Sequence, residues 1–116
     1  MKKNSDNTVS SESVNRVVGI SENLVTIGAV FPVGIIAAFF PASSATELIP
    51  IDTVAAAVVA THGECNVKTT TCVAGDWFTS DENGLAIKTD SGFALGRILS
   101  QPVDGLALCV VSPCLI

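Results

Sequence analysis

The sequence predicts a mainly β protein, folded as a small antiparallel β-barrel or β-sandwich with an extended N-terminal arm. The first observation is a series of short apolar runs in the C-terminal half, separated by turn residues. Asn83-Gly84 and Asp104-Gly105 supply the positive φ angles that tight hairpins need. Between them, Leu85, Ile87 and Thr89 alternate with Ala86 and Lys88, as in a half-buried strand. Short strands with turns about every ten residues are typical of small barrels and sandwiches.

The chain divides by composition into three parts. Residues 1–15 are polar and rich in Ser and Asn, which predicts a flexible or extended arm. Residues 16–52 are apolar and rich in β-branched side chains, so we expect strands that contact neighbouring subunits. Residues 53–116 are expected to form a small β domain, with the Ala-Val run at 53–60 as a strand rather than a short helix. No longer sequence repeat is visible.

The composition narrows the classes of function. The chain has 116 residues, enough for one domain, with 48% hydrophobic and 15% charged residues and a net charge of −5. Residues 1–46 are neutral, so residues 47–116 carry the whole net charge. This balance argues against nucleic acid as a partner, because phosphate binding needs clustered Lys and Arg. The apolar excess predicts surface that is covered by neighbouring subunits or by a membrane.

A membrane helix is the alternative for the uncharged segment Leu24–Ala42. Its nineteen residues have the length needed to cross a bilayer as a helix. However, Pro32 and Pro41 interrupt the segment, as do Gly28 and Gly34, and its many Val and Ile residues favour strands. The sequence therefore argues against a membrane, while a membrane-anchored or pilin-like surface protein with a helix over 24–42 stays as an alternative.

The four cysteines allow several states. Cys65 and Cys72 are close enough in sequence to pair across a tight loop and are the better disulfide candidate. Pairing of Cys109 with Cys114 would have to close around a proline. Zinc binding by His62 and the cysteines lacks the usual C-x2-C spacing, so we expect no metal site and no cofactor. Buried free thiols are the remaining possibility.

No catalytic set is visible in the sequence. His62 is the only side chain that could act as a base near neutral pH without a shifted pKa, and its Thr-His-Gly setting indicates a solvated loop. The glycines are spread singly, without a phosphate-binding loop. Five carboxylates could suggest acid–base pairs, but most of them occupy turn positions where Asp bonds to backbone N–H groups. These carboxylates are Asp76, Asp81, Glu82, Asp90 and Asp104.

The run Ala74–Val111 reads AGDWFTSDENGLAIKTDSGFALGRILSQPVDGLALCVV. It resembles the pattern of small head decoration proteins, also called cement proteins, of tailed phages, and similar runs occur in β-rich domains of tail fibres and spikes. The resemblance implies that Gly75-Asp76 opens a strand, that Asn83-Gly84 turns a hairpin and that Gly96-Arg97 starts a strand. It covers about a third of the chain, and the more apolar N-terminal half departs from it.

The resemblance implies a non-enzymatic virion protein that decorates the capsid surface and is assembled in the host cytoplasm. Its partners would be itself, as a homotrimer, and the major capsid protein. A tail fibre, spike or baseplate accessory protein is the alternative. We expect Trp77 in the domain core. Large apolar side chains of the uncharged segment are the candidate interface residues: Phe31, Ile35, Ile36, Phe39 and Phe40.

Overall fold

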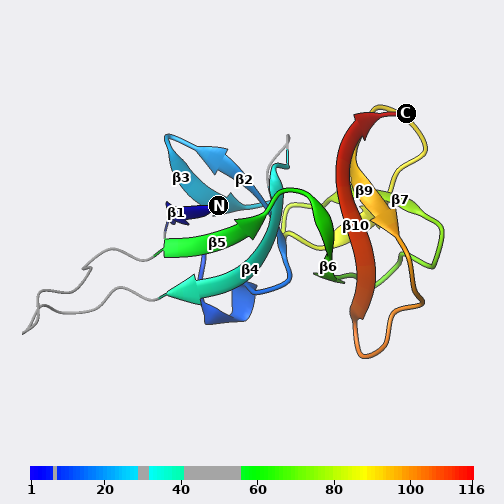
Figure 1. Cartoon of the computed structure of the whole chain (residues 1–116), viewed down its shortest axis with the longest axis horizontal. Helices are drawn as coiled ribbons and strands as arrows, with labels where there is room; N and C mark the ends of the chain where they lie inside the picture. Colours follow the sequence, from blue (N-terminus) through cyan, green and yellow to red (C-terminus); the bar gives the residue numbers. More distant parts are fainter. Residues whose placement is uncertain (7, 29–31, 41–55) are drawn as a thin grey trace, which may run out of the picture.

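The computed structural model describes residues 1–6, 8–28, 32–40 and 56–116. The described chain is mainly β and forms two antiparallel five-stranded sheets (Figure 1). The first sheet has the strand order β1-β5-β4-β2-β3. Its strands are β1 (Lys2–Asn4), β2 (Val17–Ser21), β3 (Leu24–Ile27), β4 (Gly34–Phe40) and β5 (Ala56–Ala60).

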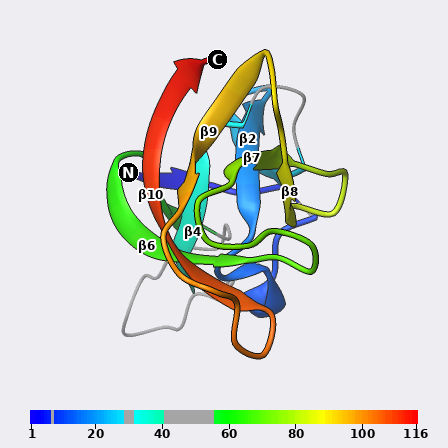
Figure 2. The ribbon, with the colours of Figure 1, turned by 90° about the vertical axis from the view of Figure 1, so that its right-hand side faces the viewer.

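The second sheet follows the first along the chain and has the order β6-β10-β9-β7-β8. Figure 2 looks onto this sheet, with β9 and β10 side by side. The two sheets pack together as in a sandwich, and their strands run across one another in Figure 1. The second sheet contains β6 (Gly63–Lys68), β7 (Trp77–Ser80), β8 (Ala86–Lys88), β9 (Phe93–Ile98) and β10 (Leu106–Leu115).

These sheets confirm the expected fold class in its sandwich form rather than as a closed barrel. In the described part of the chain, the outer strands of each sheet meet only at one isolated bridge. Ser5 bridges Val25 in the first sheet, and Thr69 bridges Ala86 in the second. A single bridge brings the edges together without the continuous hydrogen-bonded ladder that a barrel requires.

The N-terminal residues belong to the first sheet and do not form a flexible arm. Lys3 in β1 pairs with Ala57 in β5, so the chain's own N-terminus fills this edge. A single 3-10 turn, η1 (Ser11–Ser13), follows, and the Ser10 hydroxyl accepts a hydrogen bond from the Glu12 N–H. Val9 is buried. The polar composition of this segment hid its order, because its contact with the apolar core is made through Val9 and the half-buried Val14.

The uncharged segment forms strands, so the membrane helix over 24–42 is wrong for its described residues. β3 covers Leu24–Ile27 and β4 covers Gly34–Phe40. The β-branched side chains of Val25 and Ile36 are fully buried in the apolar cluster of the first sheet. Across the described residues, no helix is long and apolar enough to span a bilayer.

The Ala-Val run is a strand, as expected, but it lies in the first sheet. In β5, Val59 pairs with Ile36, and Ala57 pairs with Lys3 on the other side. The division between the two sheets therefore falls at residues 61–62, between β5 and β6, rather than at residue 53. The reason is that β5 completes its hydrogen bonds with β4 and β1, two strands that precede it in the sequence.

Alternate residues of the first sheet enter two different cores. Val18 and Ile36 point into the sheet's own cluster, together with Val25 and Val59. Val17 and Ile35 point to the other face and pack into the core of the second sheet. That second core contains chiefly residues from β6 to β10: Val67, Cys72, Phe78, Ala86, Leu95, Ile98, Ala107, Cys109 and Val111.

The two sheets form a structural repeat, because they share one strand order and one pairing register. In the first sheet Val18 pairs with Gly34; in the second, Phe78 pairs with Gly96. The single parallel bridge of each sheet also falls at equivalent places, between the residue after the first strand and a residue of the third.

We call the first sheet (β1–β5) the first unit and the second sheet (β6–β10) the second unit. Equivalent turns precede the second strand of each unit. Asn15 has a φ of 71° and Gly75 a φ of 94°, the left-handed region that Gly and Asn tolerate best. The Asn15 N–H donates to the Ile36 oxygen at 2.9 Å, and the Gly75 N–H donates to the Ile98 oxygen at 2.8 Å. The same backbone bond is therefore made twice in the chain.

Each unit also needs a glycine at one close approach of two strands. A Cβ atom on Gly34 would overlap the Ala60 carbonyl, and a Cβ atom on Gly96 would overlap the Val110 carbonyl. Both contacts involve backbone, which cannot move aside as a flexible side chain can. Glycine is required at these two positions because the neighbouring strand occupies the space of a side chain.

We expect Gly34→Ala and Gly96→Ala each to lower the free energy of unfolding by about 2–3 kcal/mol, because the added methyl group overlaps backbone. Chemical denaturation followed by circular dichroism measures this. The control Ala37→Gly, at an exposed position of β4, should cost only about 0.5–1 kcal/mol. Losses no larger than that of the control at Gly34 and Gly96 would contradict the close approach.

Candidate functional site

The structure places four of the five candidate interface residues, and their environments differ. Ile35 and Ile36 are 1% and 0% exposed, inside the two cores, so they cannot contact another subunit. Phe39 is half-buried and packs against the first core, whereas Phe40 is 48% exposed. Phe31 lies outside the described residues. The apolar segment was expected to face other subunits, but its described strands contribute Val25, Ile35 and Ile36 to the cores of its own chain.

Trp77 is not the core aromatic residue of the second sheet. It is half-buried, and the Arg97 guanidinium lies over its ring at 5.6 Å from the centroid. The next residue, Phe78, is fully buried and takes the core position. Successive residues of a strand point to opposite faces, so only one of these two aromatic side chains can face inward.

The strands of the resemblance run fall partly where it implies. Gly75 and Asp76 directly precede β7, and Asn83-Gly84 lies in the turn between β7 and β8. Gly96-Arg97, however, lies inside β9, which begins at Phe93. The glycine is needed there for the close approach to β10 and does not mark the start of a strand.

The acidic side chains near the hairpins shape turns, as their positions predicted. Asp81 Oδ1 accepts hydrogen bonds from the N–H groups of Asn83 and Leu85, both at 2.9 Å. Asp76 Oδ2 accepts from the Val73 N–H at 3.0 Å. These carboxylates hold backbone N–H groups that would otherwise lack partners in the turns.

Near the N-terminus, Asp6 ties the chain to β3. Its N–H donates to the Val25 oxygen at 2.9 Å, and its carboxylate accepts hydrogen bonds from Thr8. Partial burial acts to raise the pKa of Asp6, but the hydrogen bonds from Thr8 and Thr26 outweigh it and lower that pKa. The carboxylate is therefore held in its charged form, as an acceptor for the residues that follow it.

His62 lies exposed in the connection between β5 and β6. Within the described ranges, no group of three or more His, Cys, Asp or Glu side chains is arranged to hold a metal ion. The zinc alternative with His62 therefore has no support from the described geometry.

Exposed apolar side chains concentrate on the hairpin of β9 and β10. β10 is ten residues long, whereas β6 pairs with it only as far as Val111. The C-terminal end of β10 therefore extends past β6, which leaves Leu115 82% exposed. At the other end, Val103 in the turn is 71% exposed. We define the hairpin surface as Leu99, Val103, Leu108, Leu115 and Ile116, all of them exposed.

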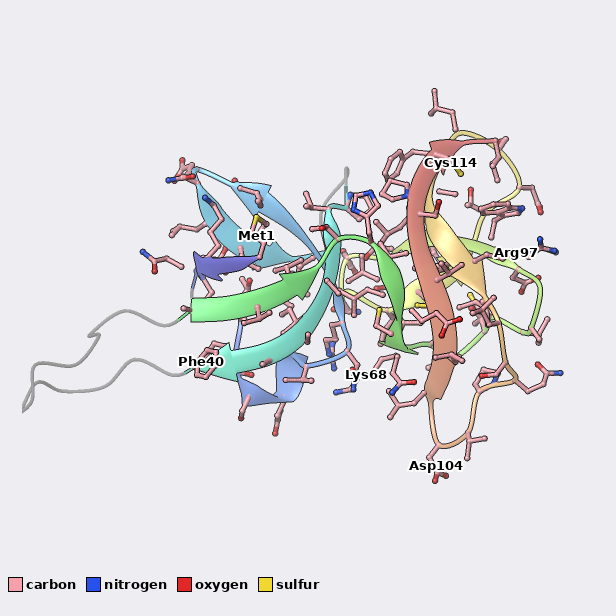
Figure 3. The ribbon with its side chains drawn as sticks, viewed as in Figure 1. Met1, Phe40, Lys68, Arg97, Asp104 and Cys114 are labelled. Atoms are coloured by element: carbon pink, nitrogen blue, oxygen red, sulfur yellow. The ribbon has the colours of Figure 1, made fainter. Side chains whose placement is uncertain are left out.

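Sequence reasoning missed the hairpin surface because it interpreted the run LALCVVS only as a strand. The residues of this strand alternate between faces: Ala107 and Cys109 are buried, whereas Leu108 is 38% exposed. Leu99 lies beside Leu108, since its N–H donates to the Leu108 oxygen at 2.8 Å. Figure 3 shows the turn of this hairpin at Asp104 and its far end near Cys114.

The cysteine nearest to Cys65 is Cys109, and Cys72 is not its partner. Cys65 and Cys109 face each other on the paired strands β6 and β10, with their Sγ atoms 3.9 Å apart. All four cysteines are free thiols. Cys72 is buried at a different place, where its N–H donates to the Thr69 hydroxyl. The local pairing of Cys65 with Cys72 is wrong because strand register, rather than sequence distance, decides which thiols meet.

The contact between Cys65 and Cys109 makes the two thiols chemically unequal. The hydrogen bond with Cys109 lowers the pKa of the Cys65 thiol, although burial opposes this. The same hydrogen bond, together with burial, raises the pKa of Cys109. Cys65 is half-buried and Cys109 fully buried. Cys65 is therefore the thiol that ionises first and that a reagent can reach.

We expect a small-molecule disulfide such as oxidised glutathione to convert this pair into a Cys65–Cys109 disulfide. The Cys65 thiolate attacks the reagent and releases one thiol; Cys109 then loses its proton and displaces the second, so the protein loses two hydrogens. Peptide mass spectrometry without reduction identifies the pair, and the free energy of unfolding should rise by about 2–4 kcal/mol.

The variant Cys72→Ser serves as a control and should still form this disulfide. The variant Cys109→Ser should form no intramolecular disulfide at Cys65. A Cys65–Cys72 peptide in the oxidised wild-type chain would contradict the structure.

Comparison with models of protein families, with curated proteins and with solved structures found no match to this chain.

Proposed function

We propose that this chain is a non-enzymatic structural protein of a tailed-phage particle, a capsid decoration protein. It self-associates, as a homotrimer, and bridges neighbouring copies of the major capsid protein to stabilise the head. The observation that carries the proposal is the hairpin surface, which presents five exposed apolar side chains on one β-hairpin.

Exposure of this kind is typical of a protein that works in an assembly. Of the large apolar side chains exposed in the described part of the chain, those on the hairpin surface include the two most exposed, Leu115 and Val103. Contact with another subunit would remove this apolar area from water, at roughly 25 cal/mol per Å2, before the costs of association. A groove for a small ligand would instead need concave walls with a few converging polar groups.

The phage assignment is supported by the resemblance of Ala74–Val111 to decoration proteins. In the structure this run starts just before β7 and ends near the last residue of β10 that pairs with β6. It therefore covers the strands that carry most of the hairpin surface. The acidic excess of residues 47–116 would help to keep a decorated particle soluble.

The test uses the full-length chain together with expanded heads and purified tails of the phage that encodes it. We expect a homotrimer in solution by light scattering, and binding to heads but not to tails by co-sedimentation. Binding to tails alone would favour a fibre, spike or baseplate component. A chain that stays monomeric at high concentration and binds neither heads nor tails would contradict the proposal.

The double variant Val103→Glu with Leu108→Glu tests the hairpin surface directly. Both side chains are exposed, so the fold should survive, whereas charges in an apolar interface are costly to desolvate. We expect self-association and head binding to weaken at least about tenfold. Thr70→Glu, at an exposed loop position outside the hairpin, is the control and should behave as the wild type. Equal binding by the two variants would exclude this surface.

A further inference from the structure

The repeat shows which face of the second unit corresponds to the contact between the units. Val17 pairs with Ile35 in the first sheet, and Trp77 pairs with Arg97 at the equivalent positions of the second. Val17 and Ile35 are 0% and 1% exposed because the second sheet covers them. Arg97 is exposed, on the side facing away from the first sheet (Figure 3), and Trp77 is half-buried beneath its guanidinium.

The backbone oxygens of Asn15 and Gly75, which are equivalent in the two units, accept hydrogen bonds from different donors. The Asn15 oxygen accepts a hydrogen bond from the Lys68 N–H of the other unit at 2.7 Å. The equivalent oxygen, on Gly75, accepts a hydrogen bond from the Arg97 side chain, through Nε at 3.1 Å. Arg97 thus occupies the place that a third unit would take, and its guanidinium also covers the Trp77 ring.

At the opposite end of the molecule, the described residues that match this contact are exposed. The second unit contacts the first through the end of β6, at Lys68, and through the turn between β7 and β8, where the Gly84 oxygen accepts from the Val17 N–H at 2.6 Å. The equivalent parts of the first unit are Asn4 and the turn at Glu22-Asn23, and all three residues are exposed. A second copy of this chain therefore has a surface of the right kind to continue the array.

We propose that Trp77 and Arg97 form a cap on the second unit. The cap prevents a second copy of this chain from docking head-to-tail, so the row of stacked units ends after two. The contact between the units is heterologous, since one surface meets a different one, and such contacts continue into rings or filaments unless they are blocked. Arg97 blocks it because docking would desolvate a charged guanidinium and would break its bond to Gly75. Terminal repeats of solenoid proteins carry polar outer faces for the same reason.

The cap uses residues other than those of the hairpin surface, although Arg97 lies on β9 of the same hairpin and pairs with Val110 of β10. The cap follows from the repeat and does not assume the proposed function. The test gives the second unit the residues of the first, as the double variant Trp77→Val with Arg97→Ile. We expect this variant to assemble with rising concentration, so that its weight-average mass in analytical ultracentrifugation more than doubles relative to the wild type. The wild-type chain should keep its own oligomeric state over the same range.

Two further variants distinguish head-to-tail assembly from nonspecific aggregation. Asn4→Pro removes the N–H equivalent to that of Lys68, which in β6 points away from the partner strand and toward the other unit. Added to the double variant, it should restore the wild-type mass. Arg97→Lys keeps the charge and should stay in the wild-type state.

If the double variant loses its circular dichroism spectrum, Arg97→Ile alone is used, because that side chain is exposed. A folded variant whose mass equals that of the wild type at every concentration would overturn the cap. Assembly that persists after Asn4→Pro would overturn the head-to-tail geometry.

Discussion

The packing of Val17 and Ile35 into the core of the second sheet is the contact on which the rest of the structure depends. These two side chains leave the outer face of the first sheet and become interior residues of the second. They join two small sheets, each with its own cluster of buried residues, into one structure. The backbone bonds between Val17 and Gly84 and between Lys68 and Asn15 fix their relative position.

This contact also explains how one architecture serves two different purposes. The first unit turns Val17 and Ile35 toward a neighbour, whereas the second unit carries Trp77 and Arg97 at the same two places. The backbone geometry at the two places is the same, but the side chains differ. Val17 and Ile35 are buried, whereas Trp77 is half-buried and Arg97 is exposed to solvent. The apolar area left over for other molecules belongs to the hairpin surface, whose residues lie on the same β9–β10 hairpin as Arg97.

Much of the second sheet could be predicted from local signals, and the assignment of single residues to the inside or the outside could not. Asn83-Gly84 and Asp104-Gly105 marked their hairpins because positive φ angles restrict the residue type. Trp77, Ile35 and Ile36 were misplaced because a strand pattern does not say which face a neighbouring sheet will cover. The repeat is visible in the sequence as one short motif, Phe-x-(Val or Leu)-Gly-x-Ile, which occurs at 31–36 and 93–98. The motif is too short to be recognised as a repeat until the strand pairing shows that the two segments are equivalent.

The sequence by itself determined the β class, the turns and the absence of charge over residues 23–46, since these follow from local backbone preferences and composition. Only the tertiary structure decided that residues 1–4 complete the first sheet, that Cys65 meets Cys109, and that β5 belongs with the strands before it. Each of these depends on the register between strands far apart in the chain. Register is set by the sum of many side-chain contacts, and no single segment of the sequence records it.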